Sequence, residues 1–215
     1  MKLKEKIDNY LLDIGYSKDM VENMDTASVY IAEKIAIYAH RNQYRINGEP
    51  YINHPYSVLD RYRNFVGIVP DDYFCIDVDL LYECGVPYEG VQELCLLHDV
   101  VEDSDITIEQ IADIYANLNL GKYFDSVVKK PLSLLTHNNA DDYTKYVNKI
   151  IDNPVASLVK LIDLADNINP LSLNCFEEKE IERIQKYIKS FMEINNKWHF
   201  LENVQKYFAW KSIKD

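Results

Sequence analysis

The sequence predicts an all-α fold in a single compact domain. Apolar residues recur at helical spacing along most of the chain, and no segment shows the strict alternation that is typical of a half-buried strand. The 215 residues are 47% hydrophobic and 27% charged, with only six glycines and seven prolines. This composition is ordinary for a globular domain, and no repeat or low-complexity tract suggests a linker. We therefore expect residues 1–215 to form one domain.

The first half of the chain divides into four predicted helices. A helix is expected over about residues 24–45, where apolar side chains recur every three or four positions: Val29, Ala32, Ile35, Ala36 and Ala39. The stretch INGEPYINHP ends it with glycine and proline. Pro55 suits the first turn of the next helix, residues 56–64, which the loop VGIVPDD follows. Residues 72–84 and 87–103 read as two more helices, separated by CGVP.

The second half carries clear signals for where helices begin and end. Thr107 and Gln110 form a capping box that begins a helix reaching about Asn117. The helix in DDYTKYVNKIIDNP ends at Asn153, and Pro154 begins the next one, VASLVKLIDLADNI. From residue 177 onward, apolar residues lie on one stripe, as in packing helices: Ile181, Ile184, Ile188 and Phe191.

Charge and hydropathy exclude several classes of partner. The chain has 23 Lys and Arg against 35 Asp and Glu, a net charge of −12. Such an acidic protein repels duplex nucleic acid, whereas a small anion can bind where a metal and a few cations reverse the local field. No apolar run approaches the ~18 residues of a membrane span. The four cysteines lack metal or disulfide spacing, so we expect reduced thiols and a cytoplasmic location.

The stretch LLHDVVEDSDITIEQI places four ionisable residues within an apolar run. These are His98, Asp99, Glu102 and Asp103. Burying unpaired charge is costly, and a divalent metal would offset that cost. A neutral imidazole and a carboxylate, as in His98 and Asp99, suit manganese, iron or zinc. Glu102 and Asp103 lie a turn further on, where one of them could accept a proton from water.

Two ligands do not hold a catalytic metal well, so further ligands must come from elsewhere in the chain. His54, in YINHP, is the first candidate. Asp163, in LVKLIDLADNI, is the second, because it lies among apolar residues where an unpaired carboxylate is penalised. Asn167 is one turn beyond Asp163 on the same helix face.

Three motifs together resemble the HD-domain phosphohydrolases. AHRNQYRINGEPYINHP, LLHDVVEDSDIT and LVKLIDLADN occur in that order within residues 39–168. They are similar to motifs in the hydrolase domain of the RelA/SpoT alarmone enzymes and in the small metazoan-type alarmone hydrolases. The resemblance implies an HD-type helical bundle and a phosphohydrolase that removes pyrophosphate from guanosine tetra- or pentaphosphate (ppGpp or pppGpp).

The resemblance also implies roles for individual residues. It implies metal ligands, with manganese as the usual ion: His54, His98, Asp99 and Asp163. It implies that Glu102 and Asp103 position or deprotonate the attacking water. Arg41 and Arg45 match nucleotide-contacting positions, and Asn167 matches an asparagine near the substrate sugar. Independently of the resemblance, Tyr146 is a further candidate to line the pocket. We expect both arginines on one helix that ends just before His54.

The chain departs from the alarmone hydrolases in two places. His54 and His98 are 44 residues apart, which is longer than in that family. We expect the extra segment, Val66 to Val86, to place five carboxylates near the pocket mouth, where they would disfavour a highly charged alarmone: Asp71, Asp72, Asp77, Asp79 and Glu83. In addition, Asp166 stands where the alarmone enzymes have histidine, and the arginine after their asparagine is missing.

Other interpretations remain open. The His98–Asp99 pair could be a surface ion pair, Asp163 could pair only with Lys160, and Arg41 and Arg45 could be surface charges. The substrate could instead be another nucleotide or a phosphorylated dinucleotide cofactor. The chain could also be a non-catalytic HD domain that binds a nucleotide. The C-terminal helix offers a contact surface for a homo-oligomer.

Overall fold

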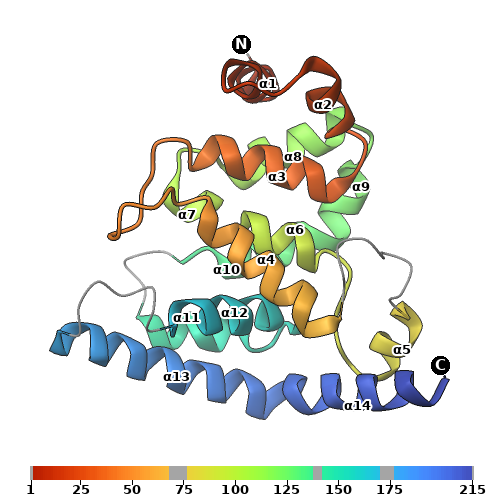
Figure 1. The fold of residues 1–215 in the computed structure, drawn as a ribbon, viewed down its shortest axis with the longest axis vertical. Helices are drawn as coiled ribbons and strands as arrows, with labels where there is room; N and C mark the ends of the chain where they lie inside the picture. The colour runs from red at the N-terminus through yellow and green to blue at the C-terminus, as the bar shows by residue number, and fades with distance from the viewer. Residues whose placement is uncertain (1, 68–76, 138–141, 170–176, 215) are drawn as a thin grey trace.

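The computed structural model describes residues 2–67, 77–137, 142–169 and 177–214 as a stack of helical layers (Figure 1). α1 and α2 lie at one end, α3 and α8 come next, α4 and α6 form the middle, and α12 packs on α13 at the other end. Within the described ranges the structure has no strand, only one isolated bridge between Tyr44 and Pro50. The predicted all-α fold is confirmed.

The described helices are α1 Leu3–Asp13, α2 Lys18–Asn23, α3 Ser28–Ala39, α4 Asn53–Val66, α5 Val78–Glu83, α6 Val91–Leu97, α7 Val100–Asp103, α8 Ile108–Asn117, α9 Gly121–Tyr123, the π-helical turn η2 Phe124–Val128, α10 Lys129–Leu135, α11 Tyr143–Ile150, α12 Pro154–Asn167, α13 Glu178–Trp198 and α14 Phe200–Lys214.

The central helix of the bundle is α6. It packs against α3, α4 and α12, and its buried side chains point in every direction: Val91, Glu93, Leu94, Cys95, Leu96 and Leu97. Apart from Glu93, these buried residues are apolar, as expected of a helix in the core of a domain. Because His98 and Asp99 directly follow α6, the chain delivers them to the interior of the bundle.

Several predicted helix ends match the structure. Thr107 and Gln110 form the capping box of α8. Asn153 caps α12, its side chain accepting from the backbone N–H of Ala156 at 2.9 Å, and Pro154 occupies the first turn. Local hydrogen bonding fixes these ends, which is why the sequence alone reveals them.

Three predicted helices differ from the observed ones. Of the helix expected over residues 72–84, α5 covers Val78–Glu83 with Asp77 as its cap, and residues 72–76 lie outside the described ranges. The helix expected over residues 24–45 spans only Ser28–Ala39. The residues after it form a loop with a turn at Gly48 (φ 84°). Backbone bonds from Arg45 N–H to Glu49 O (2.8 Å) and from Tyr51 N–H to Gln43 O (2.9 Å) stabilise this loop. The helix expected over residues 87–103 is interrupted at His98 and Asp99, between α6 and α7.

Within the described residues, no helix is both long and apolar enough to cross a membrane.

Candidate metal centre and active site

Four potential ligand atoms converge from three parts of the fold. His54 lies in the first turn of α4, His98 and Asp99 at the α6–α7 junction, and Asp163 on α12. His54 Nε2 is 3.1 Å from Asp163 Oδ1, 3.3 Å from His98 Nε2 and 3.5 Å from Asp99 Oδ2. His98 Nε2 is 3.1 Å from Asp99 Oδ2 and 3.7 Å from Asp163 Oδ1. Ligands about 2.1 Å from one shared ion are themselves roughly 3.0–3.5 Å apart, so this spacing suits a single metal.

The orientation of both imidazoles supports a metal at this point. His98 Nδ1 donates to the backbone carbonyl of Cys95 at 2.9 Å, and His54 Nδ1 donates to Asp166 Oδ2 at 2.9 Å. A carbonyl and an ionised carboxylate can only accept, so each Nδ1 carries the hydrogen. In the neutral rings each Nε2 therefore presents a lone pair, and both lone pairs face two carboxylates. Such a set of electron-pair donors requires a cation among them.

The buried charges around the cluster are strongly coupled. Burial lowers the pKa of His98, but Asp99 and Asp163 outweigh it and hold that pKa well above its ordinary value. Burial raises the pKa of Asp163, yet Lys160 and the two histidines keep it well below the usual range. Asp163 is thus ionised. Without a metal, protons on the imidazoles neutralise the carboxylates, so metal and protons compete for the same atoms.

Asp163 is held rigidly by its own helix. Lys160 Nζ lies 2.7 Å from Asp163 Oδ2, and Asn167 Nδ2 donates to Asp163 Oδ1 at 2.6 Å. The ion pair with Lys160 that we considered as an alternative role is present. It uses the oxygen that faces away from the histidines, so it does not prevent Oδ1 from binding a metal.

A cavity of about 740 Å³ opens above this cluster. Glu102 and Asp103, on α7, line it beside His54 and Asp163. Glu102 Oε2 accepts from the backbone N–H of His137 at 3.0 Å. Burial, followed by the nearby carboxylates of Asp99 and Asp103, raises the pKa of Glu102 above its ordinary value. A carboxylate with a raised pKa at the edge of a metal cluster can accept a proton from water.

The structure separates the two candidate arginines. Arg45 lines the cavity and donates from Nη2 to Asn167 Oδ1 at 3.2 Å. Arg41 instead lies over the ring of Tyr38 at 4.0 Å and donates to the carbonyl of Tyr38. It borders a different hollow of about 410 Å³ and does not line the cavity. The expectation that both arginines share a helix facing the metal is therefore wrong, because that helix ends at Ala39.

Aromatic and cationic side chains from α11 and α13 form the far wall of the cavity. Tyr146, a predicted pocket residue, lines it, and so do Tyr143 and Tyr187. Lys186 Nζ lies 4.2 Å from the ring centre of Tyr143. Arg183 is also on this wall, where Nη2 pairs with Glu180 Oε2 at 2.5 Å. The sequence does not predict the α13 residues, because nothing local connects that helix to the three motifs.

Tyr51 is a further site residue that the sequence does not predict. It lies inside the first motif, lines the cavity, and donates its hydroxyl to Asp99 Oδ2 at 2.8 Å. This bond holds the carboxylate of Asp99 toward the two histidines. A tyrosine just before a candidate ligand is a weak signal, since most tyrosines of this chain pack between helices.

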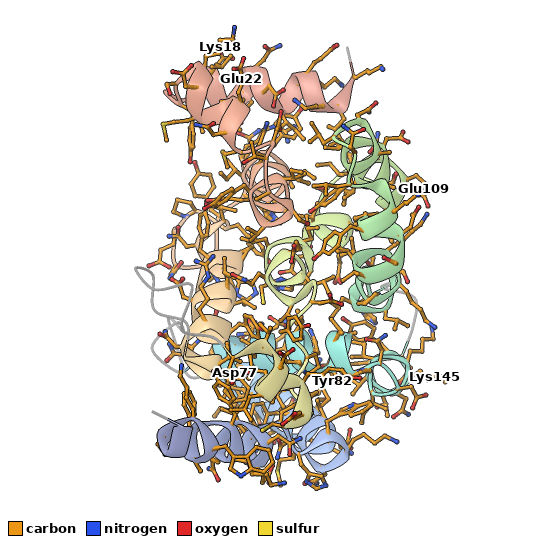
Figure 2. All side chains as sticks on the ribbon, turned by 90° about the vertical axis from the view of Figure 1, so that its right-hand side faces the viewer. Lys18, Glu22, Asp77, Tyr82, Glu109 and Lys145 are labelled. Carbon is orange, nitrogen blue, oxygen red and sulfur yellow. The ribbon has the colours of Figure 1, made fainter. Side chains whose placement is uncertain are left out.

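The described part of the segment Val66 to Val86 lies away from the cavity. Asp77, Asp79 and Glu83 belong to α5 or its cap, and none of them lines the cavity. α5 packs against α14 on the side of the bundle opposite the loop that follows α3 (Figure 1). Figure 2, viewed from that side, shows Asp77 and Tyr82 there. For these three carboxylates the predicted place at the pocket mouth is wrong; Asp71 and Asp72 lie outside the described residues.

Similar proteins support the interpretation of the motifs. A guanosine-3′,5′-bis(diphosphate) 3′-pyrophosphohydrolase of Aquifex aeolicus is 30% identical over 163 residues, which are 76% of this chain and 20% of that protein. The guanosine-3′,5′-bis(diphosphate) 3′-pyrophosphohydrolase MESH1 of Homo sapiens is 27% identical over 168 residues, 77% of this chain and 81% of that one. The chain thus spans about a fifth of the length of the Aquifex protein. No protein-family model matches the chain.

A solved structure shares the fold. It is that of a metazoan ortholog of SpoT, described as hydrolysing ppGpp and playing a role in starvation responses. It superposes with a TM-score of 0.54 at 21% identity, covering 86% of this chain and 96% of that chain. The fold likeness agrees with the sequence likeness. The chain is homologous to the HD-type hydrolase domains of SpoT and Rsh enzymes and to the small alarmone hydrolase MESH1.

Proposed function

We propose that this protein is a metal-dependent phosphohydrolase of phosphorylated nucleotides, and that its substrate is guanosine 3′,5′-bis(diphosphate), from which it removes the 3′-pyrophosphate. The convergence of His54, His98, Asp99 and Asp163 carries the proposal, together with the cavity that His54, Asp99 and Asp163 line. The cavity is the right size for a nucleotide, since small-molecule sites usually measure about 300–1,000 Å³.

The donor set indicates which metal these four residues would hold. Two imidazole nitrogens and two carboxylate oxygens suit a first-row divalent ion such as Mn²⁺, and we propose Mn²⁺. When bound, such an ion makes water more acidic and offsets the negative charge of a phosphoryl group. Tyr51 and Lys160 keep the two carboxylates aimed at it through their hydrogen bonds at 2.8 and 2.7 Å.

The acidic pair on α7 supplies the proton chemistry. Glu102 takes a proton from the attacking water while the water oxygen forms a bond to phosphorus. The bond between phosphorus and the ribose 3′ oxygen breaks, that oxygen takes up a proton from solvent water, and Glu102 later returns its own proton to solvent. The backbone bond from His137 to Glu102 holds the carboxylate beside the cluster. Asp103 lines the same part of the cavity and helps to orient the water.

Cations on both sides of the metal cluster would bind the phosphates. Arg45 borders the cavity on one side, whereas Arg183 and Lys186 border it on the α13 side. Charge-assisted hydrogen bonds from these groups suit a ligand with several phosphates. Asn167 would contact the sugar, and the ring of Tyr146 would pack against the nucleoside. These positive side chains make an anionic substrate reasonable in a protein of net charge −12.

A panel of nucleotides tests the proposal. The purified chain is incubated with Mn²⁺ and guanosine bis(diphosphate), other phosphorylated nucleotides, or dinucleotide cofactors with a ribose phosphate, and the products are separated by anion exchange. We expect pyrophosphate and guanosine 5′-diphosphate from the first substrate. Faster cleavage of a dinucleotide phosphate would overturn the alarmone assignment. Binding that persists in EDTA, with no turnover in any metal, would indicate a non-catalytic nucleotide-binding domain.

The two arginines allow a matched test of the substrate site. Arg45→Gln is expected to raise the KM for guanosine bis(diphosphate) by about tenfold or more, the usual effect of losing a charged hydrogen bond. Arg41→Gln removes the same charge outside the cavity and should change KM by less than about twofold. Steady-state kinetics at saturating Mn²⁺ measures both. Equal effects of the two variants would show that general electrostatics, rather than a direct contact of Arg45, governs binding.

A further inference from the structure

We infer that Asp166 is a positioning residue that orients the metal ligand His54. This inference rests on the proposed metal site and adds a residue that none of the three motifs assigns to it. Asp166 is one of the positions where the sequence departs from the alarmone hydrolases. It is only 4% exposed, so its carboxylate needs compensating partners inside the bundle.

The carboxylate of Asp166 has a full set of such partners, mostly on α4. Oδ2 accepts from His54 Nδ1 at 2.9 Å. Oδ1 accepts from Ser57 Oγ at 2.5 Å and from Arg61 Nε at 2.8 Å. Arg45 adds a longer ion pair, with Nη1 3.6 Å from Oδ2. One buried carboxylate on α12 is therefore bonded to three residues on the same face of α4.

These contacts fix the plane of the His54 ring. A histidine side chain rotates about two bonds, so burial alone leaves several orientations of the imidazole. The bond to Asp166 holds Nδ1, and Nε2 on the opposite side of the ring then points at Asp163 Oδ1, 3.1 Å away. Because the ring lies between Asp166 and the cluster, Asp166 cannot itself be a ligand. A carboxylate behind a metal-binding histidine both orients it and makes it a better donor.

The arrangement makes α12 responsible for two parts of the site. Asp163 would bind the metal directly, and Asp166, three residues later, would hold the histidine that binds next to it. Arg61 and Ser57 keep the Asp166 carboxylate from turning away, and they also neutralise much of its charge. Asp166 stands where the alarmone enzymes have histidine, and its bonds to His54, Ser57 and Arg61 make a carboxylate at this position compatible with the core.

Metal binding provides the test, measured without substrate. Mn²⁺ is titrated into the full chain, and unbound Mn²⁺ is followed by electron paramagnetic resonance. Asp166→Ala is expected to raise the Kd for Mn²⁺ by about 10- to 100-fold, the usual cost of losing a partner of a metal-binding histidine. Asp166→Asn keeps an acceptor for His54 Nδ1 and should give a smaller rise. The Co²⁺-loaded form of Asp166→Ala should show an altered visible spectrum, because His54 loses the bond that orients its ring and the ligand geometry changes.

Glu93→Gln is the matched control. Glu93 is also buried, at 7% exposed, and it accepts from Tyr123 at 3.0 Å away from the metal cluster. It should leave the Kd for Mn²⁺ unchanged. If Asp166→Ala fails to fold, Asp166→Asn and Ser57→Ala carry the test, with Kd rises of at least about threefold expected. Wild-type affinity and spectrum in folded Asp166 variants would overturn the inference. Absence of Mn²⁺ binding by the wild type would instead overturn the proposed metal site.

Discussion

Replacing Asp163 by alanine is expected to abolish Mn²⁺ binding and hydrolysis together. Asp163 is the only candidate ligand from α12, and its Oδ1 lies 3.1 Å from His54 Nε2 and 3.7 Å from His98 Nε2. Removing one of four ligands leaves an open site and also removes a negative charge that attracts the cation. We expect the Kd for Mn²⁺ to rise by more than about 100-fold, above the effect of a residue that only supports a ligand.

The measurement must separate loss of the metal from loss of the fold. Asp163 also pairs with Lys160 and accepts from Asn167, so alanine leaves a buried ammonium group without its carboxylate. Asp163→Asn keeps the shape and one oxygen while removing the charge. Circular dichroism reports folding of both variants, and metal analysis reports occupancy. Full occupancy by Mn²⁺ in folded Asp163→Ala would remove this residue from the ligand set.

Local signals explain which parts of the fold could be predicted. The beginnings of α8 and α12 depend on side chains within three residues of the helix start, Thr107 with Gln110 and Asn153 with Pro154. The predicted end near residue 45 was wrong, because the apolar spacing and the helix both stop at Ala39 and a loop closed by backbone bonds follows. Such bonds depend on a turn at Gly48 rather than on hydrophobic periodicity. α1, α2 and the helices from Gly121 to Leu135 were not predicted, although Ser17 caps the start of α2 by accepting from the backbone N–H of Met20.

In the candidate site, too, residues within sequence motifs could be predicted, whereas residues that only the tertiary fold brings to the site could not. The four metal ligands could be predicted because each of them lies in a motif with a strong local pattern. The structure brings these four residues together. The α13 wall could not be predicted, since Arg183 and Lys186 look like ordinary charges of a solvated helix until the fold places them in the same cavity as Arg45. Asp166 was visible in the sequence only as a departure from the alarmone enzymes. Its contact with His54 depends on the packing of α12 against α4.

Glu102→Gln should separate catalysis from metal binding. The amide keeps the size of the side chain. Its oxygen can still accept the hydrogen bond from the backbone N–H of His137, which lies 3.0 Å from Glu102 Oε2 in the wild type. It cannot accept a proton from water. We therefore expect Mn²⁺ binding within about twofold of wild type and a fall in kcat of about two orders of magnitude or more, the scale of a lost general base. Release of the metal by this variant would make Glu102 a ligand and overturn its assigned role.

The pH dependence of kcat gives an independent check on Glu102. Burial and the carboxylates of Asp99 and Asp103 raise its pKa, so the proton is held to a higher pH than in an ordinary glutamate. Only the deprotonated form can act as a base, so wild-type activity should rise as the pH increases through this raised pKa. At saturating Mn²⁺, where competition by protons for the metal ligands does not limit activity, this rise with pH should disappear from the residual activity of Glu102→Gln, whereas Asp103→Asn should retain it. A rise that persists in Glu102→Gln and vanishes in Asp103→Asn would transfer the role of base to Asp103.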